Sequence, residues 1–258
     1  MSIFTNSMLD PLTTLLLICL AGFTSFLTAA LGAGGGLLLL VVMASIMPIA
    51  AVIPVHGLVQ LGSNGNRMMM TFRHIDVSML TYFSIGGVIG AIGATFLVVE
   101  LPLELMKIAV GFFVIFLLWG AAPTIRETSN TWKMLVGSAT TFISMFVGAS
   151  GPLVGSLMQV NGYKKMQFIA TFSSCMTFQH FLKAIVFGTI GFSFWQWLPL
   201  ILAMIFSGAI GTWLGLKQVK KISHEKFKSV FRIILSLLSI QLIVQTLFQM
   251  IRTENVPL

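Results

Sequence analysis

Polar side chains recur at helical spacing inside an apolar stretch of this 258-residue chain. His56, Gln60, Asn64 and Arg67 lie at i, i+4, i+8 and i+11, so on a helix they form one polar stripe. No Asp, Glu, Lys or Arg occurs from 11 to 66, which is typical of a segment buried in a membrane. Polar groups are costly there and usually functional, so the stripe predicts an anion-binding surface with Arg67 as its cation.

A second apolar stretch carries a similar set, which is Ser173, Thr177, His180 and Lys183. Simpler interpretations stay open for both sets. Arg67 and Lys183 lie near helix ends, where long side chains snorkel to the membrane interface. The histidines can be core residues with satisfied hydrogen bonds, and the hydroxyls of Ser173 and Thr177 can bond back to helix carbonyls.

Two glycine-rich runs interrupt the apolar segments. The first holds Gly32, Gly34, Gly35 and Gly36, and the second holds Gly148, Ser150 and Gly151. In hydrocarbon an unpaired amide is so costly that a non-helical break is tolerated only where protein covers it or where it lines a polar cavity. The helix after each break would direct its positive end and its N–H groups at the break, which suits an anion. The alternative is that the small residues only allow close helix packing.

The composition is that of an integral membrane protein. Hydrophobic residues make up 57% and charged residues 9%, with a mean hydropathy of +0.98, which excludes a soluble domain. The net charge of +8 is divided among short clusters between apolar segments, so it indicates membrane orientation rather than nucleic-acid binding. Cys19 and Cys175 each lack a second cysteine nearby, and we expect no metal and no cofactor. The first ten residues lack Lys and Arg, which argues against a cleaved signal peptide.

Apolar runs between charges and Gly or Pro breaks predict ten helices in two sets of five. The ranges are 12–31, 37–47, 50–72, 77–99 and 103–122, then 132–147, 153–160, 163–187, 194–216 and 226–251. The second helix of each set is too short for a ~30 Å core at ~1.5 Å per residue, so it forms a broken hairpin with the helix before it. Three spanning helices complete each half, which gives about eight transmembrane segments by conventional hydropathy counting.

The halves 12–123 and 132–251 also share residues, which indicates an internal repeat within a single transmembrane domain, 1–258. The paired residues are Gly32 to Leu37 with Gly148 to Leu153, Asn64 and Arg67 with His180 and Lys183, Gly90-Ala91-Ile92-Gly93 with Gly208-Ala209-Ile210-Gly211, and Glu104 and Lys107 with Glu225 and Lys228. A broken hairpin starts and ends on one side, so each half makes three net crossings. The fold class predicted is therefore an all-α membrane protein with an inverted-topology repeat.

The distribution of cations predicts which end of the helices faces the cytoplasm. One side receives Arg67, Arg73, Arg126, Lys133, Lys164, Lys165, Lys217, Lys220, Lys221, Lys226 and Lys228. The other receives Lys107, Lys183 and Arg252. Because cytoplasmic loops carry the excess of Lys and Arg, the first side is expected to be cytoplasmic and both termini are expected outside.

These motifs resemble the sulfite exporter TauE/SafE family of transporters. The similarity lies in an apolar helix that runs into Gly32-Ala33-Gly34-Gly35-Gly36-Leu37-Leu38, in its second copy Gly148-Ala149-Ser150-Gly151-Pro152, and in the turns at Gly90, Gly208, Glu104 and Glu225. It covers nearly the whole chain. The resemblance implies transport of sulfite, organosulfonates or related anions across the bacterial inner membrane. Ser150 and Pro152 depart from the glycine pattern, so the second break is expected to be stiffer.

The expected function is that of a secondary transporter that carries small anions by alternating access. A passive anion channel is the main alternative. An intramembrane enzyme is a weaker one, because the chain has neither a pair of buried Asp nor an H-E-x-x-H motif. All seven carboxylates lie at span ends or in loops, so a coupled proton would travel on the substrate or on His56 or His180. The substrate, the direction of transport and the oligomeric state, a homodimer included, stay open.

Overall fold

The chain folds into helices throughout the residues that the structure describes. The computed structural model describes residues 9–31, 34–98, 102–120, 129–218 and 224–254, with the backbone alone at 31, 224–231 and 252–254. Within these ranges the elements are α1 (Pro11–Leu31), α2 (Gly35–Ile46), α3 (Ile49–Thr71), η1 (Phe72–His74, a 3₁₀ turn), α4 (Val77–Val98), α5 (Leu103–Trp119), α6 (Asn130–Val147), α7 (Gly151–Val160), α8 (Lys165–Thr189), η2 (Phe194–Trp197, a 3₁₀ turn), α9 (Leu198–Gln218) and α10 (His224–Glu254).

The predicted set of ten helices is confirmed, and the bounds differ mainly at the helix ends. Among the described residues, four segments are long and apolar enough to cross a membrane: Pro11–Ala30, Val77–Val98, Phe194–Gln218 and Arg232–Ile251. Helices α3 and α8 have 23 and 25 residues, and they carry the polar sets found in the sequence. This pattern is typical of a multi-pass membrane protein with a polar site between two of its long helices.

Helices α2 and α7 are short because the backbone changes direction at their ends. With 12 and 10 residues they cover only about 18 and 15 Å, which is less than the ~30 Å hydrocarbon core. Helix α2 starts after Gly34, whose φ of 105° lies in the region that favours glycine. Helix α6 ends at Gly148, whose φ is 82°. Each glycine-rich run therefore does break the helix, as the sequence predicted.

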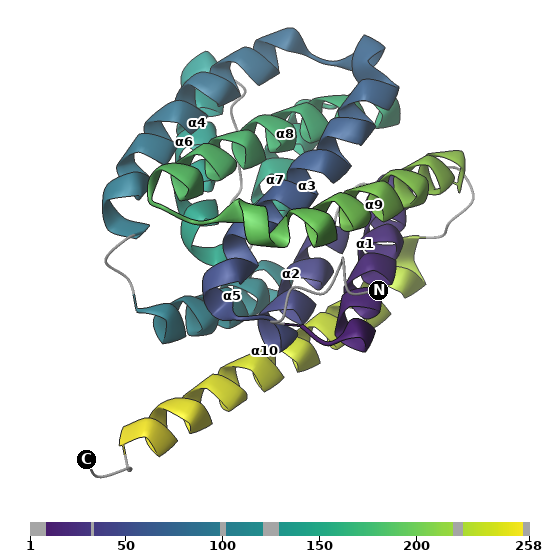
Figure 1. Cartoon of the computed structure of the whole chain (residues 1–258). Helices are drawn as coiled ribbons and strands as arrows, with labels where there is room; N and C mark the ends of the chain where they lie inside the picture. The colour runs from purple at the N-terminus through teal and green to yellow at the C-terminus, as the bar shows by residue number, and fades with distance from the viewer. Residues whose placement is uncertain (1–8, 32–33, 99–101, 121–128, 219–223, 255–258) are drawn as a thin grey trace.

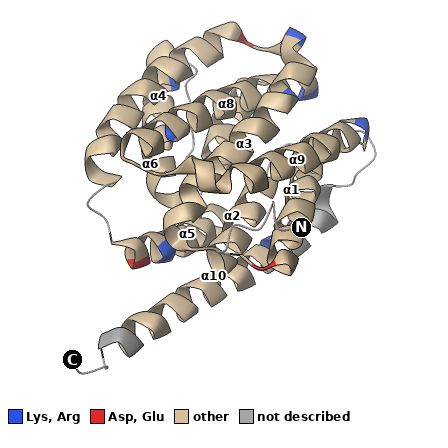
Figure 2. Ribbon diagram, in the orientation of Figure 1, with Lys and Arg blue, Asp and Glu red and all other residues tan. Residues whose placement is uncertain are grey.

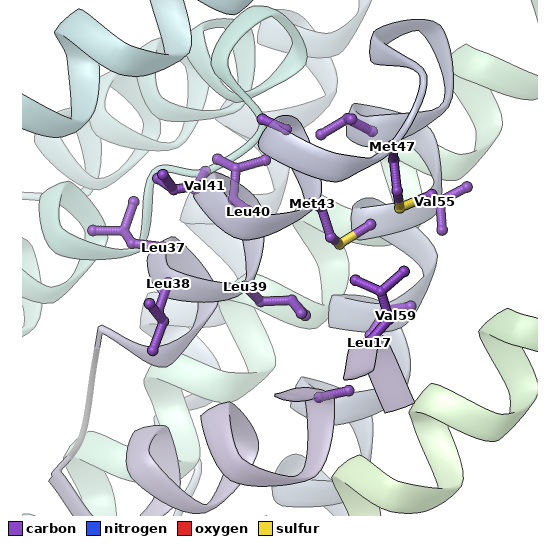
Figure 3. Packing of buried hydrophobic residues seen from close by; sticks show 14 of the residues in the cluster. Leu17, Leu37, Leu38, Leu39, Leu40, Val41, Met43, Met47, Val55 and Val59 are labelled. Atoms are coloured by element: carbon purple, nitrogen blue, oxygen red, sulfur yellow. The ribbon is translucent and has the colours of Figure 1, made fainter. Parts of the chain in front are cut away.

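Helix α2 packs inside the protein rather than against lipid. Its apolar residues contact Leu17 of α1 and Val55 and Val59 of α3 (Figure 3). Lipid is as apolar as leucine, so burial gives no hydrophobic gain in a membrane, and close van der Waals packing holds such a helix. A short helix that is apolar on all sides and covered by its neighbours positions its first turn firmly inside the bundle.

Helices α3 and α8 pack against each other in the middle of the bundle. The pair α1 and α9 lies on one side of them and the pair α4 and α6 on the other, while α5 packs against α10 (Figure 1). Glycines set the close approach of both flanking pairs. A Cβ atom at Gly211 would collide with the Gly22 carbonyl, and one at Gly90 would collide with the Ser138 carbonyl. The two G-A-I-G motifs of the sequence are thus helix contacts.

Most of the charged residues drawn in Figure 2 lie near the helix ends, and the buried Arg67 and Lys183 are the exceptions among the described residues. The three carboxylates whose side chains the structure describes are Asp10, Asp76 and Glu104, and each lies at the start of a helix. Asp10 accepts bonds from Leu12 N and Thr13 N, Asp76 accepts one from Met79 N, and Glu104 is in the first turn of α5. Negative charge is favourable at a helix N-terminus, so these carboxylates have a structural role.

Candidate functional site

A small cavity of about 40 Å³ lies where both helix breaks meet α3 and α8. It is lined by Gly34, Gly36 and Leu37 at the first break, by Ala149, Gly151 and Pro152 at the second, by His56, Gln60 and Asn64 of α3, and by Phe172, Met176 and His180 of α8. A cavity of this size has room for about three water molecules or one small oxyanion.

The α3 wall of the cavity is a chain of hydrogen bonds. Asn64 Nδ2 donates to Gln60 Oε1 at 3.2 Å, and Asn64 Oδ1 accepts from Arg67 Nη1 at 3.1 Å. Arg67 does not line the cavity, lies 1% exposed, and its Nε has no partner. The guanidinium therefore stands behind Asn64 and does not snorkel to an interface. It orients the amide and brings its positive charge close to the cavity.

The α8 wall differs from the one expected from the sequence. Phe172, Met176 and His180 line it, each 116 residues after His56, Gln60 and Asn64 respectively. The predicted Ser173 and Thr177 lie outside the cavity, because their hydroxyls donate to helix carbonyls: Ser173 Oγ to Ile169 O at 2.7 Å and Thr177 Oγ1 to Ser173 O at 2.7 Å. A strict 116-residue offset from His56 and Gln60 would have identified Phe172 and Met176. The predicted Ser173 and Thr177 each come one residue later, so they lie on a face of α8 that is turned by about 100° from the cavity.

Two buried histidines meet across the cavity. The ring centroids of His56 and His180 lie 6.1 Å apart in an edge-to-face arrangement. His56 Nε2 lies 3.0 Å from Gly36 O, and since a carbonyl only accepts, Nε2 carries the proton of the neutral ring. Nδ1 of both rings is buried without a hydrogen-bond partner. An unpartnered nitrogen in the interior is costly, so both atoms are suited to gain a partner when a ligand or a proton enters.

Two helices begin at the cavity, and their first turns differ. In α2 the first backbone bonds run from Leu37 N and Leu38 N to Gly34 O, so the N–H groups before Leu37 have no partner within the helix. Helix α7 starts with Gly151 and then Pro152, which has no N–H to offer. The first break therefore presents more backbone donors to an anion than the second.

Lys183 reaches the second break from behind. It is 0% exposed, and its Nζ donates to Gly148 O at 2.7 Å, which is the carbonyl at the C-terminus of α6. Its stem crosses α3 at Gly57, where a Cβ atom would lie 2.8 Å from Lys183 Cδ. Lys183 does not line the cavity and does not snorkel. A cation is favourable at the negative end of a helix, so Lys183 holds the break in place.

A polar network around Ser150, one of the predicted binding residues, fixes the start of α7. Ser150 Oγ donates to Gln179 Oε1 at 2.5 Å, and Gln179 Nε2 donates to Thr141 Oγ1 at 3.1 Å and Thr140 Oγ1 at 3.3 Å. All four residues are buried. Gln179, adjacent to His180 in the sequence, was the one available signal. The network explains how Ser150 takes a place where the first run has glycine.

The remaining predicted glycines have different positions. Gly32 lies outside the described residues. Gly35 is packed so closely against the Thr24 carbonyl that a Cβ atom would collide with it, so its role is close packing. Gly148 supplies the carbonyl for Lys183. Of the predicted residues, the structure thus brings Gly34, Gly36, Gln60, Asn64, Gly151, His56 and His180 together at the cavity.

The cavity is electrostatically suited to an anion. No carboxylate is among its lining residues, whereas two helix N-termini open onto it and two buried cations stand behind it. In the described part of the chain, no group of three or more His, Cys, Asp or Glu side chains is placed to hold a metal ion. Binding of a small oxyanion by N–H donors is the chemistry this arrangement offers.

Comparison with protein families gives a match to the family model described as sulfite exporter TauE/SafE, over residues 16–242. The matched range includes both helix breaks and every residue that lines the cavity. No curated protein and no solved structure matches the chain.

Proposed function

Since the chain belongs to the sulfite exporter TauE/SafE family, whose members are membrane transporters and not enzymes, we propose that it carries sulfite or organosulfonates by alternating access. One observation carries the proposal: both helix breaks, both histidines and the two amides of α3 meet at one small cavity whose lining includes no carboxylate. A site between the two halves is what a carrier exposes in turn to the two sides of the membrane.

We also propose that the two halves, 12–123 and 132–251, form an inverted-topology repeat. The packing of helix pairs supports this. If α1 corresponds to α6 and α4 to α9, the contact of α1 with α9 is the counterpart of the contact of α6 with α4. The contacts of α3 with α8 and of α5 with α10 then lie on the repeat axis. Such an arrangement would let one half open as the other closes.

The proposed binding residues fall into two groups. The direct contacts are the backbone donors of Gly34 to Gly36, the amides of Gln60 and Asn64, and His180. Arg67 and Lys183 act from behind, the first through Asn64 and the second through Gly148. Ser173 and Thr177 would contact the anion only if α8 rotates during the cycle. This assignment makes α3 the wall that grips the oxyanion.

A proton is the coupling ion that the site can accept. No described carboxylate is near the cavity to bind a cation, and the unpartnered Nδ1 atoms of His56 and His180 are available. A proton on His56 Nδ1 would turn an acceptor into a donor toward the bound anion. A protonated anion would instead donate to the same atom. Both routes move one proton together with the anion.

The orientation proposed is that of an inner-membrane protein with both termini outside. Arg73, Lys164 and Lys133 then face the cytoplasm with Lys217, and the opposite end carries Lys107. Arg126, Lys220 and Lys221, which were counted toward the same side, lie outside the described residues, as do both termini. The cation distribution in the sequence is what supports this orientation.

Sulfite flux into proteoliposomes tests the function. We expect uptake that saturates, and Asn64→Leu should raise KM about tenfold or more because it removes a hydrogen bond to a charged group. Thr177→Val is the matched control, since Thr177 lies on the neighbouring helix with its hydroxyl bonded to Ser173 O, and it should transport normally. Flux that rises linearly with sulfite would identify a channel, and equal effects of both substitutions would exclude this cavity as the binding site.

A further inference from the structure

A second, larger hollow of about 520 Å³ opens at the end of the bundle where α3 runs into η1 and α8 begins. Its lining residues are Arg73, His74, Ile75, Lys164, Lys165, Met166 and Gln167, which we call the basic groove. Arg73, His74, Lys164 and Lys165 are all exposed. The basic groove shares no lining residue with the central cavity.

Hydrogen bonds between two loops build the basic groove. Tyr163 Oη donates to Asp76 Oδ2 at 2.6 Å, and Asp76 N donates to Thr171 Oγ1 at 3.0 Å. Asp76 Oδ1 accepts from Met79 N and so caps α4. These bonds hold η1 beside the start of α8, which brings Arg73 next to Lys164. The two sets of cations are 91 residues apart in the sequence, so only this tertiary contact joins them.

Asp76, which follows Ile75 directly, accepts hydrogen bonds from Tyr163 Oη and Met79 N. Among the described residues it forms no ion pair with Arg73 or Lys164. Within the lining set there is no Asp and no Glu. Arg73 is also held by the ring of Phe72, with the guanidinium carbon 5.6 Å from the ring centroid. The groove is therefore a preformed concentration of positive charge.

The fold itself does not require this charge. At the start of α3 and the end of α8 lies another hollow, of about 400 Å³, whose lining includes Ile49, Ile190 and Gly191. At the same 116-residue offset, Ile49 corresponds to Lys165, Ile190 to His74 and Gly191 to Ile75, and these three counterparts line the basic groove. No charged residue lines that second hollow. The two ends of the bundle thus have similar hollows with different chemistry.

We propose that the basic groove is a separate binding site for oxyanions. Its size admits a hydrated anion or a bulky phosphate, and it is much larger than the central cavity. The ligand is either a free sulfur oxyanion or the phosphate of an anionic lipid, because Arg and Lys bind both through the same charge-assisted bonds. The inference rests on the proposed function only for the identity of the free anion.

A fluorophore in the groove tests this. Cys19→Ser removes the exposed thiol, buried Cys175 is unreactive, and a bimane is attached to a cysteine introduced by Met166→Cys. The protein is placed in nanodiscs of neutral phosphatidylcholine and titrated with inorganic sulfate, with chloride at equal ionic strength as the reference. We expect the bimane fluorescence to change with sulfate concentration and to saturate. Arg73→Gln and Lys164→Gln should each weaken the affinity for sulfate about fivefold, which corresponds to the ~1 kcal/mol typical of one cation at a membrane surface.

Lys217→Gln is the matched control, since it also removes a cation from a helix end, where Lys217 Nζ lies 3.3 Å from the Trp213 ring centroid outside the groove. It should leave the titration unchanged. A response to phosphatidylglycerol in the nanodisc but not to sulfate supports the site with lipid phosphate as its ligand. A response to neither, or an equal loss with Lys217→Gln, overturns the proposal. Because the readout needs no transport, a protein that fails to carry sulfite can still pass this test.

Discussion

The two walls of the cavity differ residue by residue. Helix α3 presents the amides Gln60 and Asn64, while α8 presents Met176 at the place that corresponds to Gln60. An oxyanion therefore finds amide groups on α3, whereas α8 offers His180 together with the apolar side chains of Phe172 and Met176. This asymmetry makes substitutions on α3 the more damaging ones for affinity, and it makes the first break the more sensitive of the two.

Gly34→Leu should abolish transport while the protein still inserts into the membrane. The φ of 105° at Gly34 is unfavourable for any side chain by about 1–3 kcal/mol, and the leucine would also fill the cavity. Gly162→Leu is the control, because its φ is 63° and nothing lies within 4 Å of a Cβ atom there. Both variants should lose similar stability in a thermal unfolding assay. Normal sulfite flux by a well-expressed Gly34→Leu protein would contradict the assignment of the site.

Lys183→Met should lower stability and maximal rate but leave KM nearly unchanged. It keeps the apolar stem and removes the ammonium, so Gly148 O loses its partner at a cost of about 1–3 kcal/mol. Lys183 does not line the cavity, so the affinity for the anion should change little, in contrast to Asn64→Leu. Thermal unfolding and sulfite kinetics separate the two effects. A rise in KM as large as that of Asn64→Leu would show that Lys183 contacts the anion directly.

At the scale of elements, short helices and loop contacts decide the geometry. The break before α2 is positioned by a helix that packs inside the bundle, and the start of α7 is fixed by the Ser150–Gln179 bond. At the end of α3, the Asp76–Tyr163 bond joins the turn η1 to the loop before α8. That last contact lies between the ends of the two helices that form the cavity, so it restrains their relative movement.

Tyr163→Phe should lower the free energy of unfolding by about 1–3 kcal/mol, since it deletes a hydrogen bond to a carboxylate. Burial raises the pKa of Asp76, but hydrogen bonds from Tyr163 and Met79 outweigh it and hold the pKa below its usual 3.8. Burial, and then the bond to Asp76, raises the pKa of Tyr163. The lowered pKa of the carboxyl stabilises the folded protein at pH values above that usual value. The raised pKa of the phenol stabilises the folded protein at pH values below ~10.

The difference in melting temperature between wild type and Tyr163→Phe should therefore be constant from about pH 5 to pH 9. It should shrink as the pH falls below about 4, because the carboxyl of the unfolded protein takes up a proton there, whereas Asp76 in the folded protein stays ionised until the pH falls through its lowered pKa. Thr171→Val is a useful comparison, because it removes the neighbouring bond from Asp76 N without touching the carboxylate, and its effect should not depend on pH in this way. A difference that changes between pH 5 and pH 9 would contradict the described bond.

For the whole molecule, the arrangement of helix pairs and the charge at the two ends lead to one topology. The flanking pairs α1 with α9 and α4 with α6 enclose α3 and α8 (Figure 1). The basic groove lies at one end of α3 and α8, and the apolar hollow lies at the other. The proposed inverted repeat with a positive cytoplasmic end would account for both features. An anion would then meet opposite surroundings on its two approaches to the same cavity.

Cysteine labelling tests that topology. Thr131→Cys, at the start of α6, should resist an impermeant maleimide in intact cells and react after lysis, whereas Ser193→Cys, before η2, should react before lysis. Both positions are exposed, and the Cys19→Ser background leaves only buried Cys175. Thr131→Cys labelled before lysis, or Ser193→Cys protected, would reverse the orientation. Both protected or both labelled in intact cells would contradict the inverted repeat.

The sequence by itself determined the helices and indicated a candidate site. Apolar length, charge at helix ends and the glycine runs are local properties, so ten helices and two breaks followed from them directly. His56, Gln60 and Asn64 could be found because one helix face has a fixed spacing. The 116-residue offset also contained Phe172 and Met176, but apolar residues give no chemical signal in a chain that is 57% hydrophobic.

Only the tertiary structure decided what the charged and hydroxyl groups do. Arg67 and Lys183 look alike in sequence, yet Arg67 bonds to the Asn64 side chain on its own helix α3, whereas Lys183 reaches the Gly148 carbonyl at the end of α6, which only helix packing brings close to it. The hydroxyls of Ser173 and Thr177 donate to carbonyls of their own helix, since a carbonyl one turn away is within reach of a hydroxyl. The basic groove joins loops distant in the chain, and that meeting is set by the contact of α3 with α8.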